Sequence, residues 1–406
     1  MSPRGMSQPD PMMQIAAPAP RVPPQWRIGA YYSTAFLSSG VATAFGGIWF
    51  AAQGIGAERI GVLNALPVLL LLVLNLWVGR IADRAADWRT VIVAGAMVAA
   101  VAPYALFVVS GFWGILAVWT CAAVSQSLIV PVTDAAAMRM SRRSGFDFPS
   151  LRAWGTVGYL TVILATGYLA TWFGPGVFVP LLCAVVTLRA LVALGLPRFR
   201  DPAGRRGASP GAGALLEVMR PWFVLPLVGW SIIFATHLIL NAFQGLLWKQ
   251  QGLPENVIGM LIALGALAET AMFFGYRRFS GRFSPRKLIL ASALVAVLRW
   301  IAFAFSPGVP LLVLLQLLHA VTYALGFVAC ISFITKWTSD DIAAETQSFF
   351  VVLQQGFSAI ALTGFGGLAG RYGAQAYLAS AVLAALGAGL IWLSLSLKQP
   401  GDAPGP

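Results

Sequence analysis

Charge is scarce in this 406-residue chain. Only 10% of its residues are charged, whereas a soluble protein usually carries about 25%. Acidic residues are the rarest of these, with 14 Asp and Glu against 27 Lys and Arg, while 58% of the residues are hydrophobic and the mean hydropathy is +0.79. This composition excludes an ordinary soluble protein and predicts a polytopic membrane protein.

Cysteine and histidine are also rare. The three cysteines fall inside apolar runs at unrelated spacings, so they predict neither a disulfide framework nor a metal site. The two histidines have no cysteine or acidic partner at ligand spacing, and the sequence holds no zinc, P-loop or G-x-S-x-G motif. We therefore expect no metal, no cofactor and no enzymatic activity.

Long apolar runs are abundant. A membrane-spanning helix needs about 20 apolar residues, and twelve runs qualify: 28–53, 60–79, 90–109, 112–138, 150–172, 176–196, 222–248, 256–276, 288–306, 309–335, 343–369 and 374–397. The connection 197–221 is rich in Pro, Gly and Arg, which is typical of a linker. The predicted fold class is an all-α polytopic membrane protein with 12 transmembrane helices in two six-helix halves.

The predicted domains follow from these runs. They are a disordered cytoplasmic tail at 1–27, a six-helix bundle at 28–196, the cytoplasmic linker at 197–221, a second six-helix bundle at 222–397 and a cytoplasmic tail at 398–406.

The basic residues predict the orientation of the chain. Only Arg59, Lys249 and Arg371 fall in loops on one side, whereas most other Lys and Arg residues fall in the tails, the linker and the loops of the opposite side. Cytoplasmic loops are enriched in Lys and Arg, so both termini are expected in the cytoplasm, with the protein multi-pass in a bacterial-type cytoplasmic (inner) membrane. The basic surplus thus reflects the lipid bilayer, and we expect no nucleic-acid partner.

The two halves repeat one another. At an offset of 198 residues, ten of the 32 positions in 53–84 are identical, including Gly61 with Gly259 and Arg80 with Arg278. Six-helix halves related as parallel repeats are typical of major facilitator transporters, whose substrate lies near the membrane midplane between the halves.

The loop after the second apolar run holds a motif. Gly79-Arg80-Ile81-Ala82-Asp83-Arg84 resembles the signature of that superfamily, in which the acid is thought to latch the inner gate. We therefore expect an inner gate formed by Gly79, Arg80, Asp83 and Arg84. The alternative is a solvated basic loop that only sets the topology. The second copy has Gly281 in place of the acid, so any second latch must differ.

Ionisable residues inside the spans indicate a functional site. A charge at the bilayer centre costs at least about 2.5–3.5 kcal/mol, so Glu269, Arg299 and His319, in successive spans, should face each other or a wet cavity. Asp134 and Arg152 lie near the same ends of consecutive spans and are expected to pair. The role of this pair is either substrate binding or proton coupling, or it is a purely structural ion pair.

Polar side chains at helical spacing extend this site. One stripe comprises His237, Asn241 and Gln244, and a second comprises Gln316, His319 and Tyr323. An imidazole titrates near physiological pH and suits proton relay, although a membrane histidine also serves simply as a hydrogen-bonding group between helices. Tyr159 and Gln354 are expected to add to the lining.

Several of these segments together resemble one family. They are Pro131-Val132-Thr133-Asp134-Ala135, Arg152-Ala153-Trp154-Gly155-Thr156, Ala268-Glu269, Arg299-Trp300 and Gln316-Leu317-Leu318-His319. This combination resembles the phenylpropionate-permease-like family of the major facilitator superfamily, a relative of the lactose permease and nucleoside–proton symporter group.

The sequence departs from the family pattern in two places, before Arg152 and after His319. The family's D-Y-G-R-x-R-x-W-G-S segment has Pro149 and Ser150 here in place of a glycine and its first arginine, which weakens any substrate assignment based on that loop. The lactose permease also has an acid one turn after its span-10 histidine, where this chain has Thr322. The resemblance therefore implies that Glu269 or Asp134 carries a coupling proton.

The predicted function is secondary active transport, by proton-coupled symport, of a small organic solute such as an aromatic carboxylate. The proton-coupling candidates are Glu269, Asp134 and His319. The substrate-binding candidates are Arg152, Arg299, His237, Asn241, Gln316, Tyr159 and Gln354, with aromatic surface offered by Trp49, Trp154, Trp248 or Tyr159. We expect a monomer whose partners are a small-molecule substrate, protons and lipid.

Three alternatives remain open at this stage. A sugar or nucleoside proton symporter would use Asn241, Gln316 and Gln354 as hydrogen-bonding groups. Drug efflux is less favoured, because 155–172 lacks the glycine–proline motif that multidrug antiporters usually carry in the fifth span. A non-transporting membrane sensor could carry the same intramembrane charges.

Overall fold

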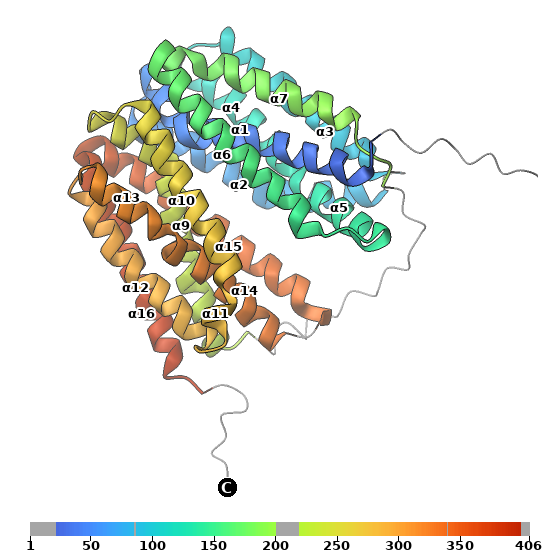
Figure 1. The fold of residues 1–406 in the computed structure, drawn as a ribbon. Coiled ribbons are helices and arrows are strands. Elements are labelled where there is room, and N and C mark those ends of the chain that lie inside the picture. The colour runs from blue at the N-terminus through green and yellow to red at the C-terminus, as the bar shows by residue number, and fades with distance from the viewer. Residues whose placement is uncertain (1–21, 85–86, 200–218, 339, 399–406) are drawn as a thin grey trace, which may run out of the picture.

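The computed structural model describes residues 22–84, 87–199, 219–338 and 340–398, and the regular secondary structure in these ranges is entirely helical. Side chains are described at these positions except at 76, 78–84 and 340–344. The predicted tails at 1–27 and 398–406 and the linker at 197–221 lie mostly outside the described residues. Figure 1 shows two bundles, one blue to green and one yellow to red.

The first bundle runs from α1 to α7. Its elements are α1 (Pro24–Ala52), α2 (Ala57–Arg84), α3 (Trp88–Val101), the 3₁₀ turn η1 (Ala102–Phe107), α4 (Gly111–Leu128), α5 (Val130–Ser144), α6 (Phe148–Phe173), the 3₁₀ turn η2 (Pro175–Val177) and α7 (Phe178–Leu194).

The second bundle runs from α9 to α16. Its elements are α9 (Pro221–Gln250), α10 (Glu255–Gly275), α11 (Arg277–Ser280), α12 (Pro285–Ala304), α13 (Val309–Leu317), the π-helical turn η3 (Ala320–Leu325), α14 (Gly326–Trp337), α15 (Asp340–Tyr372), the 3₁₀ turn η4 (Gly373–Ala376) and α16 (Tyr377–Leu395).

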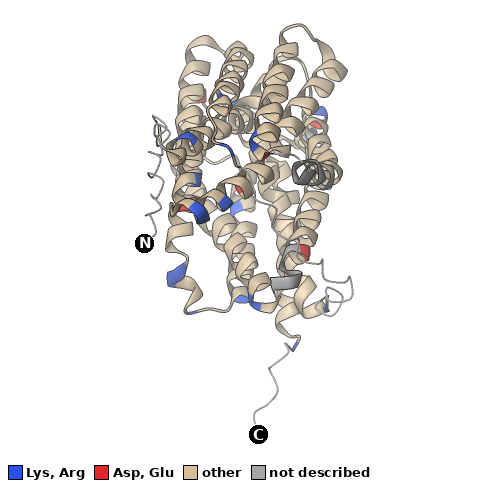
Figure 2. Ribbon diagram, turned by 90° about the vertical axis from the view of Figure 1, so that its right-hand side faces the viewer, with Lys and Arg blue, Asp and Glu red and all other residues tan. Residues whose placement is uncertain are grey.

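The twelve apolar runs all fold as helices, which confirms the predicted fold class. Within the described residues, 11 stretches are long and apolar enough to cross a membrane, and the last of them, Glu345–Leu395, contains parts of both α15 and α16. Figure 2 shows how few positions along these helices are charged. The first helix starts at Pro24, before its predicted start at 28, because proline is well suited to the first turn of a helix.

The fourth span of each half is broken, which the sequence analysis did not predict. In the first half, α4 ends and α5 begins around Ile129, and Pro131 lies in the first turn of α5. Proline lacks the amide hydrogen and its ring clashes with the preceding turn, so it breaks a helix at this point. In the second half, the π-helical turn η3 interrupts the span between α13 and α14.

Six glycines bring the two halves into backbone contact near the start of α2, which carries Arg59, and the end of α9, which carries Lys249. We call this the outer side. The six glycines are Gly47 and Gly245 where α1 crosses α9, Gly61 and Gly366 where α2 crosses α15, and Gly167 and Gly259 where α6 crosses α10. A Cβ at Gly245 would lie only 2.2 Å from the carbonyl oxygen of Ala44. Small residues permit such close helix approach, so the outer ends of the two halves are packed together.

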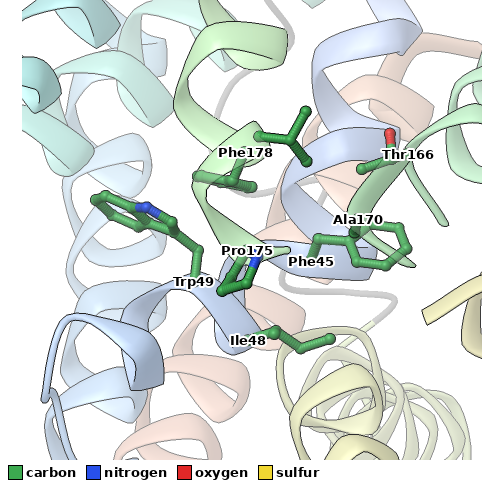
Figure 3. Close-up of a pocket in the computed structure, with 8 residues that line it drawn as sticks. Phe45, Ile48, Trp49, Thr166, Ala170, Pro175 and Phe178 are labelled. Carbon is green, nitrogen blue, oxygen red and sulfur yellow. The ribbon is translucent and has the colours of Figure 1, made fainter. Parts of the chain in front are cut away.

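Aromatic residues fill the space behind these crossings. Trp49 stacks on Phe178 with ring centroids 5.2 Å apart, and Phe50 meets Trp119 edge to face at 4.9 Å. The gap beside Trp49, Pro175 and Phe178 measures only about 10 Å³ (Figure 3). Such a space is at the lower limit for one water molecule, so this outer region is a packed seal and not a solute site.

Candidate functional site

A cavity of about 920 Å³ lies between the two halves. It is lined from α1, α6, α9, α10, α13 and η3 by Phe36, Ser39, Thr43, Phe148, Pro149, Arg152, Ala153, Thr156, Val157, Tyr159, Leu160, Leu240, Asn241, Gln244, Ile262, Gly265, Ala266, Leu267, Glu269, Thr270, Phe273, Phe274, Gln316, His319 and Tyr323. The lining reaches the inner end of α6 at Phe148 and the inner end of α10 at Phe274. Since the outer ends are packed together, the cavity extends toward the inner side.

The first half contributes a partly exposed cation to this cavity. The Arg152 side chain is 38% exposed, and its Nε lies 3.8 Å from Oδ2 of Asp134, so the expected pair of these residues is present. Tyr32 donates its hydroxyl to Oδ1 of Asp134 at 2.7 Å. The guanidinium of Arg152 also lies over the ring of Phe36, 5.2 Å from its centroid. This ion pair is loose, so Arg152 retains donors that a ligand in the cavity could use.

The second half contributes a carboxylate and an imidazole. Oε2 of Glu269 lies 3.4 Å from Nε2 of His319, and the Glu269 side chain is 26% exposed. The imidazole ring stacks on Tyr323 with its centroid 5.2 Å away and the planes 2° apart. The π-helical turn positions this ring pair on the cavity wall, and such turns occur frequently at functional sites.

Arg299 lies behind this wall and is fully buried. Its Nε donates to the carbonyl oxygen of Leu315 at 2.7 Å, and one terminal nitrogen donates to Oε1 of Gln316 at 2.8 Å. The other terminal nitrogen donates to Nδ1 of His319 at 3.1 Å and to Oγ1 of Thr322 at 3.0 Å. None of these four acceptors is a carboxylate. Arg299 therefore organises the residues that form the wall.

Neutral amides connect the cavity wall to its neighbours. Gln316 donates from Nε2 to the carbonyl oxygen of Leu261 at 3.0 Å and toward Oε1 of Gln244 at 3.4 Å. Gln316, Gln244 and Asn241 all line the cavity. These groups can donate to and accept from hydroxyl, amide or carboxylate groups of a solute.

Six predicted residues line the cavity besides Glu269 and His319. They are Arg152, Asn241, Gln316, Tyr159 and, from the predicted stripes, Gln244 and Tyr323. Asp134 lies behind Arg152 and reaches the cavity only through that residue.

Three predicted substrate-binding residues lie outside the cavity lining. Arg299 and His237 are buried behind Gln316, His319 and Tyr323, because their helices turn these side chains toward the neighbouring span. Gln354 of α15 is 5% exposed and is not part of the cavity lining.

Of the four residues expected to offer aromatic surface, Tyr159 lines the cavity and the three tryptophans do not. Trp49 belongs to the outer seal, and Trp248 is 1% exposed and stacks on Phe303. Trp154 packs edge to face on Trp26 outside the cavity. The remaining aromatic lining comes from Tyr323, a member of a predicted stripe, and from four phenylalanines that gave no signal in an apolar chain, namely Phe36, Phe148, Phe273 and Phe274.

The predicted inner gate falls on Gly79, Arg80, Asp83 and Arg84, whose side chains lie outside the described residues. The gate remains a prediction. Metal binding is a separate question, and the described ranges contain no group of three or more His, Cys, Asp or Glu residues that could hold a metal ion.

Sequence reasoning missed one buried cluster in the first half. Arg189 of α7 is 2% exposed; its guanidinium donates to Oε1 of Gln126 at 2.6 Å and to the hydroxyl of Tyr31 at 3.1 Å. Ser38 also donates to Oε1 of Gln126 at 2.8 Å. The signal was an arginine within an apolar span. The cluster joins α1, α4 and α7 and does not reach the cavity.

Known proteins resemble this chain over most of its length. Residues 25–379 match the family described as "MFS_1 like family". The "Probable 3-phenylpropionic acid transporter" of Escherichia coli (strain K12) is 27% identical over 376 residues, covering 91% of this chain and 94% of that protein. The "Maltose permease" of Geobacillus stearothermophilus is 26% identical over 318 residues, covering 77% of this chain and 78% of that protein.

Solved structures share the same fold. The crystal structure of nucleoside transporter NupG matches with a TM-score of 0.81 at 17% identity, covering 93% of this chain and 100% of that chain. The crystal structure of a D-xylose–proton symporter matches with a TM-score of 0.69 at 13% identity, covering 91% of this chain and 97% of that chain.

Proposed function

Because the chain belongs to the MFS_1 like family, whose matched relatives are membrane transporters and not enzymes, we propose that it imports a small aromatic carboxylate together with a proton. Import by alternating access requires a site that faces one side of the membrane at a time. The outer ends of the halves are packed together, and the cavity lining extends to the inner ends of α6 and α10. This arrangement supports the proposal as an inward-facing state.

The observation that carries the proposal is that Arg152 from one half and Glu269 from the other line the same cavity, together with several aromatic residues. An arginine fork matches the geometry of a carboxylate and can bind it through two parallel hydrogen bonds. Phe36 and Phe148 lie beside Arg152 in the lining, where they could pack against the ring of an aromatic acid. The first-half wall thus has the chemistry of an aryl carboxylate site.

Glu269 supplies a reason for coupling to protons. An ionised Glu269 in the cavity repels an anionic solute, and protonation of its carboxyl removes that repulsion. Charges interact more strongly in a partly desolvated cavity than in bulk water. Proton and anion binding would therefore favour one another, so that an inward proton gradient drives accumulation of the anion.

The proposal also covers the oligomeric state of the protein and its orientation in the membrane. We propose that the protein acts as a monomer in the cytoplasmic membrane with both termini in the cytoplasm. The distribution of basic residues supports this orientation, since Arg59, Lys249 and Arg371 are the exceptions on the outer side.

A sugar or nucleoside proton symporter is the second candidate. Asn241, Gln244 and Gln316 line the cavity from the second half and suit a neutral, hydroxyl-rich solute. The names of two matched proteins, a maltose permease and a nucleoside transporter, also favour it.

Counterflow in proteoliposomes tests the proposal. Purified protein would be reconstituted with unlabelled 3-phenylpropionate inside and labelled 3-phenylpropionate outside, with maltose and uridine as parallel solutes. We expect exchange of the aromatic acid, and accumulation of it when an inward proton gradient is imposed. Exchange of only the sugar or nucleoside would support the second candidate, and a lack of exchange for all three would contradict both and favour a sensor.

A further inference from the structure

The two histidines of the chain lie side by side. His319 is part of the cavity wall, and His237 lies behind it. The ring centroids of His237 and His319 are 5.4 Å apart, although the residues belong to helices far apart in the sequence. A histidine that carries a coupling proton must be able to hold a proton on both ring nitrogens. The hydrogen-bond partners of each nitrogen decide whether this is possible here.

The tautomer of His319 follows from Arg299. A guanidinium has only donors, and one of its terminal nitrogens lies 3.1 Å from Nδ1 of His319. Nδ1 must therefore be the acceptor and cannot carry a hydrogen. In a neutral ring the hydrogen then resides on Nε2, which faces Oε2 of Glu269 at 3.4 Å.

The tautomer of His237 is the opposite one. Its Nδ1 lies 3.0 Å from the carbonyl oxygen of Ile233, which only accepts, so Nδ1 carries the hydrogen. Its Nε2, at 3.1 Å from Oγ1 of Thr322, is then the acceptor. Thr322 satisfies this requirement because its oxygen accepts from Arg299 at 3.0 Å while its hydroxyl hydrogen points to His237.

These contacts form one continuous chain of donors. It runs from Arg299 to His319, whose Nε2 faces Glu269 at 3.4 Å, and branches from Arg299 through Thr322 to His237 and the carbonyl of Ile233. Each hydrogen in the chain has one acceptor, and each acceptor has one donor. Reversing either histidine would place two donors or two acceptors against each other.

We propose that both histidines stay neutral, in opposite tautomers, and that His319 is a positioning residue that holds Glu269 and does not carry the coupling proton. This inference rests on the proposed function in so far as Glu269 is the proton carrier. The Nε2 hydrogen of His319 can donate to Glu269 whether its carboxyl is ionised or protonated, because a carboxyl oxygen accepts in both states. The acid can therefore titrate while its position is kept.

The surroundings oppose a second proton on either ring. His319 faces the cation of Arg299 from α12, Glu269 from α10, His237 from α9 and Tyr323 from η3. A hydrogen on its Nδ1 would meet the Arg299 donor directly. His237 faces His319, Trp300, Tyr323 and Thr322, so the described groups around it include no carboxylate to stabilise a charged ring.

Nitrogen NMR of ¹⁵N-histidine-labelled protein tests this inference. The chain has only two histidines, so the spectrum of the full-length protein in detergent or nanodiscs holds two rings, and His319→Gln assigns them by removing one. We expect a hydrogen on Nε2 of His319 and on Nδ1 of His237, with both rings neutral from about pH 5 to 8, the range in which an unperturbed histidine titrates. A charged ring within that range, or the same tautomer in both rings, overturns the proposal.

Thr322 provides matched variants for the same spectrum. Thr322→Val removes the hydroxyl with little change of shape and should shift the Nε2 resonance of His237 by removal of its donor, while Thr322→Ser should restore it. An unchanged resonance in Thr322→Val would show that Thr322 is not the donor and would contradict the chain of hydrogen bonds.

The spectra test the tautomers separately from the proposed function. The spectra require no transported solute, so they report on the tautomers even if 3-phenylpropionate is not a substrate. Conversely, a failure of proton-driven accumulation with correct tautomers would contradict the proposed symport and leave the neutral histidines standing.

Discussion

Gly366 of α15 lies so close to Gly61 of α2 that a Cβ on Gly366 would sit 3.1 Å from the Cα of Gly61 and 2.7 Å from the carbonyl oxygen of Ala57. The backbones of the two halves therefore touch at this crossing, which can persist only while both positions lack side chains. The crossing is part of the outer seal, so its disruption should act on the conformational equilibrium more than on the cavity.

The first prediction concerns this seal. Gly366→Ala should separate the outer ends of α2 and α15, because overpacking a tight contact costs about 1–3 kcal/mol. Spin labels at the exposed residues Gln53 and Gln375 should show a longer mean distance than in the wild type. Gly364→Ala is the matched control on the same helix, since nothing lies within 4 Å of a Cβ there.

The control variant Gly364→Ala should not open the outer side. Alanine in place of glycine within a helix is stabilising by roughly 0.5–1 kcal/mol where space allows, so Gly364→Ala should keep the wild-type label distance and lose no thermal stability. Equal label distances in Gly366→Ala and Gly364→Ala would show that the Gly61–Gly366 contact does not hold the outer side closed.

The second prediction concerns Glu269. Glu269→Gln keeps the shape of the side chain and can still accept from Nε2 of His319, but it cannot gain or lose a proton. Counterflow of the solute should persist, whereas accumulation driven by a proton gradient should be abolished. Labelled solute uptake into proteoliposomes, with and without the gradient, measures both activities.

A matched control exists at the outer side. Glu255 forms an ion pair with Lys249 at 2.7 Å and lies outside the cavity. Glu255→Gln should therefore retain proton-driven accumulation. If Glu269→Gln concentrates solute to the wild-type level, Glu269 is not the coupling group.

The third prediction concerns Arg152. Hydrogen bonds to a charged group contribute about 1.5–3 kcal/mol, so Arg152→Ala should weaken binding of an aromatic carboxylate by about 10-fold to 100-fold. The corresponding primary alcohol should lose much less affinity, because it has no carboxylate to pair. Thermal-shift titration of purified protein with each solute measures the difference.

Arg142, an exposed arginine of α5, serves as the control. Arg142→Ala removes the same charge at a distance from the cavity and should leave both affinities unchanged. An equal loss of acid and alcohol binding in Arg152→Ala would make Arg152 a structural partner of Asp134 and not a carboxylate site.

The sequence was sufficient to predict the helices and part of the site. Apolar runs of about 20 residues have few alternatives in a bilayer, where backbone groups must bond internally. The ion pair of Asp134 with Arg152 was predictable because the two residues lie near the same ends of consecutive spans. The contact of Glu269 with His319 followed from the high cost of leaving either side chain in lipid.

The rotation of each helix about its axis was not predictable in the same way. Apolar residues surround Arg299 on every face of α12, so the hydrophobic pattern could not decide between the cavity and the neighbouring α13. The π-helical turn after His319 was also missed, since no proline marks it and Gly326 follows its end. Gly326 packs directly against Trp230 of α9, a tertiary contact that a local pattern does not contain.

The last prediction concerns Arg299. Lysine keeps the charge but lacks the planar fork that serves Leu315, Gln316, His319 and Thr322 at once. Arg299→Lys should leave buried acceptors without donors, at about 1–3 kcal/mol for each, and so lower the melting temperature of the purified protein. Arg282→Lys, at an exposed position, should not.

The same variant separates a supporting role from direct substrate contact. Because Arg299 acts on the cavity through Gln316 and His319, its replacement should weaken the aromatic acid and the matching alcohol to a similar extent. Arg152→Ala, in contrast, should discriminate between them. A selective loss of the acid in Arg299→Lys, with normal melting, would place Arg299 in contact with the carboxylate and would contradict its assignment behind the wall.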